Sequence, residues 1–183
     1  LYKTSSYVFN DTEHAANLFG LRELGNIYTR LMNPTTDVLE QRVTALDGGA
    51  AALGLASGTS GVFYSIINVA QEGDEIVSAN NLYGGTYTQF NDILPKFGIK
   101  VNFVDPHDPA NYAAAITDKT KALFCETVSN PGLDVADLEA IAKIADDHGI
   151  PLIVDSTFST PYLTQPIQHG ASIVIHSLTK WLG

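Results

Sequence analysis

The sequence has a single cysteine, few basic residues and no long apolar run, and each shortage excludes a class of protein. Cys125 is the only cysteine among 183 residues, so no disulfide can form within the chain and a reducing compartment, the cytoplasm, is expected. No apolar run approaches the roughly 18 residues of a membrane span, and no basic-then-apolar signal segment opens the sequence. We therefore expect no membrane association.

Basic residues are outnumbered two to one. The 10 Lys and Arg against 20 Asp and Glu give a formal charge of −10, which leaves no basic surface to displace counterions from a phosphate backbone and excludes nucleic acid as a partner. Hydrophobic residues make up 45% and charged residues 16%, which indicates a globular protein. The sequence starts at Leu1 without a methionine and stops soon after Lys180, so we expect a fragment of a longer polypeptide.

Residues 1–34 show weak periodicity and are expected to form an N-terminal arm, with Asp11 capping a short helix that ends at Leu18. A second helix is expected to start at Thr36 or Asp37, where Asp37-x-x-Glu40 resembles a capping box, and to end at Gly48-Gly49.

Strand and helix patterns then alternate, which predicts an α/β fold with a mostly parallel sheet flanked by helices over residues 35–183. The expected strands are Ala51–Ala56, Glu75–Ala79, Lys100–Val104, Lys121–Glu126, Pro151–Asp155 and Ile173–Ile175; the expected helices are the one that follows Gly61 and ends near Val69, Thr86–Phe97, Ala110–Ile116 and the one before Gly149.

Polar groups follow the predicted strands, and the carboxyl ends of parallel strands share one edge of a sheet. Ser57-Gly58-Thr59 lies between a strand and a helix, where free amides and the helix dipole can bind an anion, although such turns also occur simply for packing. Asp155 ends an apolar strand and needs a cationic partner if buried, unless it is a turn residue. Ser177-x-Thr179-Lys180 could bind a phosphorylated aldehyde, with Lys180 forming a Schiff base; alternatively, Lys180 is an ordinary solvated lysine.

Two further groups fit the same ligand. Tyr83, followed by two glycines, could stack on a flat cofactor or could be a core aromatic. In the arm, Tyr28-Thr29-Arg30 places a hydroxyl and a guanidinium on one side of an extended segment, which suits a phosphate, or forms an ordinary surface pair.

Taken together, these motifs resemble the Cys/Met-metabolism family of pyridoxal-phosphate (PLP) enzymes, which have the fold type I (aspartate aminotransferase-like) architecture. The resemblance covers almost the whole chain and rests on Tyr28-Thr29-Arg30, Ser57-Gly58-Thr59, Glu126-Thr127-x-Ser129-Asn130-Pro131, Val154-Asp155-Ser156-Thr157 and His176-Ser177-Leu178-Thr179-Lys180. Within the family, Gly25–Arg30 and Asn81–Tyr87 are most similar to O-acetylhomoserine sulfhydrylases.

The resemblance implies a role for each matching residue and implies no metal. Lys180 would carry PLP, Asp155 would pair with its ring nitrogen, and Tyr83 would stack on the ring; these are the implied catalytic residues. The other implied cofactor contacts are Gly58, Thr59, Ser177 and Thr179 at the phosphate, Asn130 and Thr157 near the ring edge, and Tyr28 and Arg30 at the phosphate of a neighbouring subunit.

The implied reaction is γ-replacement on O-acetyl-L-homoserine by sulfide or a small thiol, giving homocysteine or methionine and acetate. Methionine γ-lyase and cystathionine γ-synthase or γ-lyase are alternatives, and a non-catalytic domain on the same fold is a remote one. The family also implies a homotetramer, built as a dimer of dimers. Its substrate-carboxylate arginine lies in a C-terminal domain that is expected to be absent from this sequence.

Overall fold

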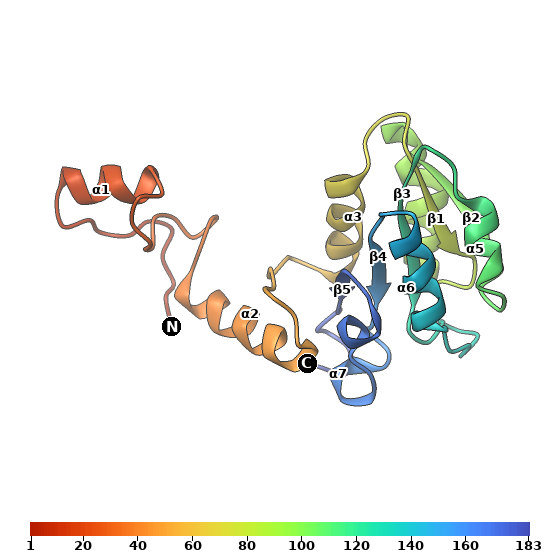
Figure 1. The fold of residues 1–183 in the computed structure, drawn as a ribbon. Helices are drawn as coiled ribbons and strands as arrows, with labels where there is room; N and C mark the ends of the chain where they lie inside the picture. The colour runs from red at the N-terminus through yellow and green to blue at the C-terminus, as the bar shows by residue number, and fades with distance from the viewer. The chain divides into compact units, whose positions relative to one another are not determined.

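The computed structural model describes residues 1–183, and their contacts divide the chain into two compact units, Leu1–Gly54 and Leu55–Gly183 (Figure 1). Each is described separately. The second helix, which the sequence analysis placed in the core, belongs to the first unit together with residues 1–34.

The first unit contains two helices. In α1 (Thr12–Phe19), Asp11 Oδ1 accepts the His14 amide at 2.7 Å, which confirms the expected cap. Helix α2 (Pro34–Asp47) begins earlier than expected, because Asn33 Oδ1 accepts the Thr35 amide at 2.8 Å and Pro34 suits a first helical position. The expected start at Thr36 or Asp37 was therefore wrong, whereas the end is confirmed by Gly48, which adopts a left-handed conformation with φ 69°.

The first unit has almost no core of its own. Leu18 and Ile27 are its only buried hydrophobic residues, while Val8 and Leu24 are 96% and 94% exposed. Folding of this unit therefore gains little from apolar burial within Leu1–Gly54.

The second unit is built on a parallel sheet with strand order β2-β1-β3-β4-β5. The strands are β1 (Glu75–Ala79), β2 (Lys100–Val104), β3 (Thr120–Glu126), β4 (Leu152–Asp155) and β5 (Ile173–Ile175), close to their expected positions. Strands β1, β3 and β4 are almost entirely buried because helices cover both faces of the sheet.

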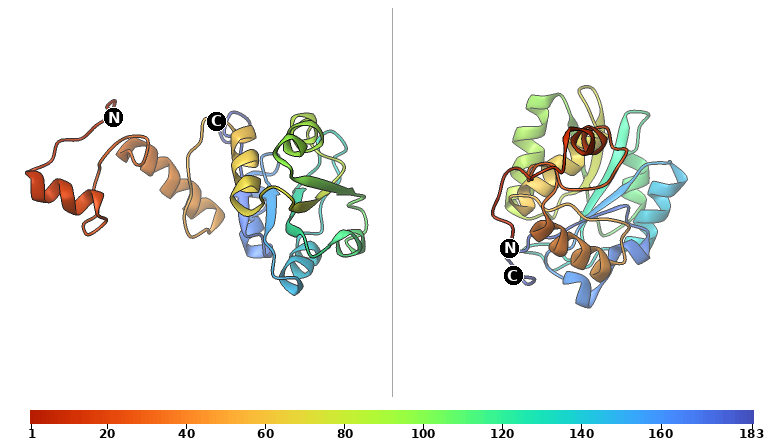
Figure 2. Two further views of the ribbon diagram at one scale, coloured as in Figure 1. Left: turned by 90° about the horizontal axis from the view of Figure 1, so that it is seen from above. Right: turned by 90° about the vertical axis from the view of Figure 1, so that its left-hand side faces the viewer.

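Two groups of helices make these layers. Helix α3 (Gly58–Val69) contacts α4 (Gly84–Thr88), which continues as a π-helix (Gln89–Ile93) and a 3₁₀-helix (Leu94–Phe97); α5 (Ala110–Ala115) contacts α6 (Leu138–Asp147). Figure 1 shows α3 on the opposite side of the sheet from α5 and α6, and Figure 2 gives two further views of the chain. No helix is long and apolar enough to span a membrane.

Two segments differ from the sequence prediction. The segment Ala51–Ala56 is not a strand: alanine and glycine have weak strand propensity, and no other strand pairs with it. The connection between β4 and β5, expected to be a loop, contains the short helices α7 (Thr160–Leu163) and η3 (Pro166–His169).

The order of the strands reverses between β1 and β3. From β1 the chain moves outward to β2, and then crosses back to β3 and continues to β4 and β5. In open α/β sheets the ligand crevice lies at such a reversal, beyond the carboxyl ends of the strands. The loops that follow β1 and β3 therefore start at the place where a ligand is expected.

Candidate active site

A chain of hydrogen bonds links the ends of β4 and β5. Asp155 Oδ1 accepts the Thr157 amide at 2.9 Å, and Thr157 Oγ1 accepts the Ser177 amide at 2.8 Å. Ser177 Oγ lies 3.2 Å from Thr179 Oγ1, which accepts from Lys180 Nζ at 3.2 Å. The structure thus brings together five of the predicted site residues.

The N-terminus of α3 packs directly against this group. A Cβ atom on Gly58 would lie 2.6 Å from the Ser177 Cβ, closer than real Cβ atoms approach one another, so only glycine allows this contact. Ser57 caps the helix by accepting the Ser60 amide at 3.1 Å, and its carbonyl accepts the Gly61 amide. The amides of Gly58 and Thr59 are left to donate to a ligand.

These amides and the hydroxyls of Ser177 and Thr179 form a set of donors suited to a phosphate group. They lie beside the amine of Lys180, which is solvent-exposed together with Thr179. A phosphorylated aldehyde offers a partner for both, because its phosphate can accept from the amides and hydroxyls and its aldehyde can react with the Lys180 amine.

Asp155 is partly buried at the end of β4, where its carboxylate retains acceptor capacity for a cation. Burial raises the pKa of the Asp155 carboxyl above its usual range, while hydrogen bonds from Thr157 and the charges of His176 and Lys180 act to lower it. A cationic ligand would stabilise the ionised form further.

Tyr83 lies at the start of α4, after β1, with 49% of its surface exposed. A Cβ on Gly85 would come within 2.5 Å of its Cε1 atom, so glycine at position 85 makes room for the ring. Tyr83 is therefore not a core aromatic, and its ring can contact a flat ligand.

Glu126, the last residue of β3, entered the sequence analysis only as the end of an expected strand and the first residue of a family motif, with no role of its own. Its Oε1 atom accepts the Tyr83 amide at 2.6 Å and its Oε2 atom accepts the Asn130 amide at 3.1 Å. In the register of β3 and β4 it lies opposite Asp155. The signal that could have identified it is the one used for Asp155, a carboxylate that directly follows a buried strand.

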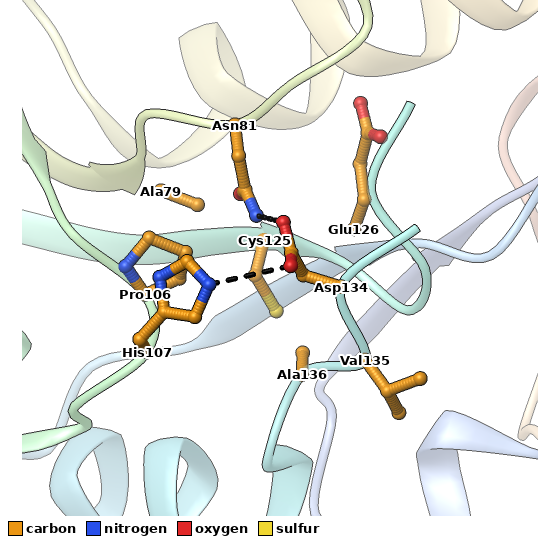
Figure 3. A pocket seen from close by; sticks show the side chains of 9 residues that line it. All are labelled: Ala79, Asn81, Pro106, His107, Cys125, Glu126, Asp134, Val135 and Ala136. Carbon is orange, nitrogen blue, oxygen red and sulfur yellow. Dashed lines mark hydrogen bonds and ion pairs between the residues drawn. The ribbon is translucent and has the colours of Figure 1, made fainter. Parts of the chain in front are cut away.

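Figure 3 shows a small cavity of about 20 Å³ near the same edge, beside Glu126. Asp134 joins three loops there: its carboxylate accepts from Asn81 Nδ2 at 3.0 Å and lies 3.3 Å from His107 Nε2, while its amide donates to Ser129 Oγ at 2.9 Å. Hydrogen bonds from Asn81, His107 and Ser129 lower the pKa of Asp134. The volume suits about one water molecule and is too small for a cofactor. The hydrogen bonds of Asp134 hold the three loops together.

Tyr28 and Arg30, the predicted phosphate clamp of the arm, lie in the first unit. Both are solvent-exposed, and the chain at Tyr28 forms an isolated antiparallel bridge with Ser6. The amide of Leu31 donates to the Tyr28 carbonyl, so the clamp ends in a turn.

The second unit thus has the fold of a fold type I, PLP-dependent enzyme, a parallel α/β sheet flanked by helices, and it brings a helix N-terminus, a carboxylate and a lysine to one edge of the sheet. Comparison with known families agrees with this class. The family described as Cys/Met metabolism PLP-dependent enzyme matches residues 1–183, and the chain belongs to this family.

Similar proteins have consistent names. The chain is 57% identical to the O-acetyl-L-homoserine sulfhydrylase of Leptospira meyeri and 51% identical to the homocysteine synthase of Schizosaccharomyces pombe, in each case over all of this chain but only 41% and 43% of the relative. A crystal structure from Campylobacter jejuni subsp. jejuni that contains N'-pyridoxyl-lysine-5'-monophosphate is 44% identical, with a TM-score of 0.96 over 99% of this chain and 45% of that one. The chain spans less than half the length of these relatives.

The residues of the second unit fit PLP in three respects. The close approach of Gly58 to Ser177 leaves amide and hydroxyl donors for a phosphate, Lys180 offers an amine, and the partly buried Asp155 can accept from a positive partner, which a protonated pyridine nitrogen would supply.

Proposed function

We propose that the protein of which this chain is part catalyses γ-replacement on O-acetyl-L-homoserine, in which sulfide or a small thiol displaces acetate and gives homocysteine or methionine. The observation that carries the proposal is the hydrogen-bonded group from Asp155 to Lys180 beside the free amides of α3. The names of relatives at 57% and 51% identity support the choice of substrate.

In this proposal the chain's own residues bind, orient and move protons. The amides of Gly58 and Thr59 and the hydroxyls of Ser177 and Thr179 would bind the cofactor phosphate. Tyr83 would stack on the cofactor ring and Asp155 would pair with its nitrogen, while Asn130 and Thr157 would hold the edge of the ring. When bound, PLP supplies an electron-poor ring that stabilises negative charge at the substrate α-carbon.

Lys180 has two tasks. Its amine would hold the cofactor by a covalent bond, and when free it would accept the proton that leaves the substrate α-carbon. Over the whole reaction, acetate leaves Cγ with the electron pair of its C–O bond, and the sulfur nucleophile gives up a proton and takes its place at the same carbon. Lys180 is exposed and donates one hydrogen bond, to Thr179, so its amine is accessible for both tasks.

We further propose that residues 1–34 form an arm that reaches a neighbouring subunit, that residues 35–183 are part of the PLP-binding domain, and that the whole protein is a homotetramer. The lack of a core in the first unit supports this, because Val8 and Leu24 would gain burial against another chain. Tyr28 and Arg30 would then complete the phosphate site of the neighbour.

An assay of the full-length protein with O-acetyl-L-homoserine, with and without sulfide, tests the reaction. We expect homocysteine and acetate only when sulfide is present, and a visible absorbance band that is lost on borohydride reduction. Formation of 2-oxobutanoate and ammonia without sulfide would instead indicate a γ-lyase. A colourless full-length protein that does not take up added PLP would contradict the enzyme proposal.

A further inference from the structure

Glu126 connects two loops across the point where the strand order reverses. Its carboxylate ends β3 and is only 8% exposed. One oxygen accepts the amide of Tyr83, in the loop after β1, and the other accepts the amide of Asn130, in the loop after β3. Glu126 thereby holds the backbone of Tyr83 and of Asn130, the two residues whose side chains are expected to contact the ligand.

This geometry is selective for an ionised carboxylate. Two main-chain N–H groups converge on the side chain, and a carboxylate is the only side-chain end that accepts at both atoms without carrying a donor. Glutamine would face one of the amides with its own NH₂ group, and aspartate is one methylene shorter. A protonated glutamic acid would likewise present a hydroxyl to one of the amides.

We propose that Glu126 is a positioning residue whose carboxylate, by holding the Tyr83 and Asn130 amides together, sets the place of both residues for binding the PLP ring. This rests on the proposed function, since the ring that Tyr83 and Asn130 contact is that of the proposed cofactor. Glu126 itself touches neither cofactor nor substrate; it acts through the two loops.

The negative charge of Asp155, next to Glu126, links the ionisation of Glu126 to cofactor binding. Burial raises the pKa of Glu126 to about 7. The hydrogen bond from the Tyr83 amide lowers this pKa, the negative charge of Asp155 raises it, and the hydrogen bond from the Asn130 amide lowers it. Asp155 itself is faced by His176 and Lys180 from the β5 side, and burial raises the pKa of the neighbouring Cys125 thiol to about 12, so this group is neutral. A cation bound at Asp155 removes the repulsion, so cofactor binding favours the ionised Glu126.

The direction of the pH effect follows. As pH rises through about 7, Glu126 becomes ionised and both amides gain an acceptor. The affinity of the apo-protein for PLP should therefore contain a component that increases from about pH 6 to about pH 8. A variant with a neutral side chain at this position lacks that component.

The variant experiment uses full-length protein with Glu126→Gln, the shorter Glu126→Asp, and Glu72→Gln as the matched control, an exposed glutamate before β1. Titration of each apo-protein with PLP should show an affinity reduced roughly tenfold or more in Glu126→Gln, by loss of a charge-assisted hydrogen bond. Its pH dependence between about 6 and 8 should be flatter than that of the control. The visible circular dichroism of the bound cofactor should fall, while borohydride still attaches PLP to Lys180.

A second measurement uses the unaltered protein and does not depend on whether a variant folds. Hydrogen exchange of the amides of Tyr83 and Asn130 should be slower at about pH 8 than at about pH 6, after correction for the intrinsic rates, and slower again with PLP bound. The amide of Ala70, which donates to the Ile66 carbonyl in α3 at 2.9 Å, serves as the internal reference.

The outcomes separate this inference from the proposed function. If Glu126→Gln binds PLP with the affinity, pH profile and circular dichroism of Glu72→Gln, the positioning role is refuted. Equal protection of the two amides at both pH values would refute it as well. If the unaltered protein binds no PLP at all, the proposed function fails, and the exchange of the two amides in the apo-protein still decides whether Glu126 holds the loops.

Discussion

Asp155 and Glu126 occupy equivalent places, since each is the last residue of a buried parallel strand and they are paired in the register of β3 and β4. Their partners differ. Glu126 gives both oxygens to main-chain amides, whereas Asp155 is held on the side of Thr157 and keeps capacity for another partner. The difference supports the proposed roles, in which Glu126 holds two loops in place and Asp155 binds the ligand.

The Asp155→Asn variant tests this assignment. Asparagine keeps the size and an acceptor for the Thr157 amide but removes the charge, so the fold should survive while the ring nitrogen loses its anionic partner. We expect kcat/KM of the full-length enzyme to fall by at least about a hundredfold, as for other electrostatic contacts to a reacting group. Steady-state kinetics and PLP retention during dialysis measure the effect, with the exposed Asp146→Asn as control. Near-normal turnover would make Asp155 a turn residue only.

Lys180 offers an independent prediction, because its side chain is exposed and makes one hydrogen bond, to Thr179. Lys180→Ala should abolish turnover and borohydride-dependent labelling by PLP, yet change the free energy of unfolding by only about 0.5 kcal/mol or less, as is usual for exposed positions. Mass spectrometry of the reduced protein and chemical denaturation provide the two readouts. Lys96→Ala, another exposed lysine, should keep both activity and label; labelling of the Lys180→Ala protein at another lysine would show that the nucleophile is elsewhere.

At the level of elements, the close approach of α3 to the residues that follow β5 brings together the donors of the proposed phosphate site. Gly58→Ala would place a Cβ 2.6 Å from the Ser177 Cβ, with the Ser177 Cα at 3.0 Å, so backbone must move. Such overpacking typically costs about 1–3 kcal/mol of stability, and here it also separates the amides from the hydroxyls. We expect PLP affinity in the full-length protein to fall by roughly tenfold or more, on the same free-energy scale.

Gly49→Ala is the control for this change, because the nearest atom to its added Cβ, the Ala51 carbonyl oxygen, is 3.9 Å away. Its stability should be unchanged or raised by about 0.4–1 kcal/mol, through reduced freedom of the unfolded chain. Thermal unfolding and PLP titration of both variants separate a general effect of alanine from the specific contact. Equal PLP affinity in the two variants would show that the α3 terminus does not bind the phosphate.

The sequence was sufficient to predict most strands because β-branched apolar runs such as Ile173–Ile175 must lie inside a parallel sheet. The polar residues at the strand ends could be placed on one edge for the same reason. Short segments were harder: Ala51–Ala56 lacks a partner strand, and α7 is a single turn whose first residue, Thr160, has φ 58°. Contacts over long separations, such as Glu126 to the Tyr83 amide, could not be read from spacing.

At the level of the whole molecule, the first unit and the second unit differ in what holds them together. The sheet of the second unit has a continuous apolar core, whereas the first unit buries only Leu18 and Ile27 among its hydrophobic residues. A segment that buries so little apolar surface gains the free energy needed to offset its loss of conformational entropy by packing against another surface. In a two-fold dimer the arms would be exchanged reciprocally, and each would carry Tyr28 and Arg30 to the other chain's site.

Mixing two inactive full-length variants tests this exchange. In Arg30→Ala subunits the lysine is intact, and in Lys180→Ala subunits the arm is intact, so each is inactive alone if both groups serve every site. A hybrid dimer has one site with an intact Lys180 from one chain and an intact Arg30 from the other, while its second site lacks both. Random two-fold assembly makes half of the dimers hybrid, so about a quarter of all sites should be whole.

Activity should therefore rise, after denaturation and joint refolding, toward about a quarter of the unaltered enzyme's. Separately refolded variants mixed without exchange are the control, and native mass spectrometry confirms the hybrids. If confirmed hybrids are as inactive as their parents, Arg30 serves its own chain and the arm does not complete a neighbouring site.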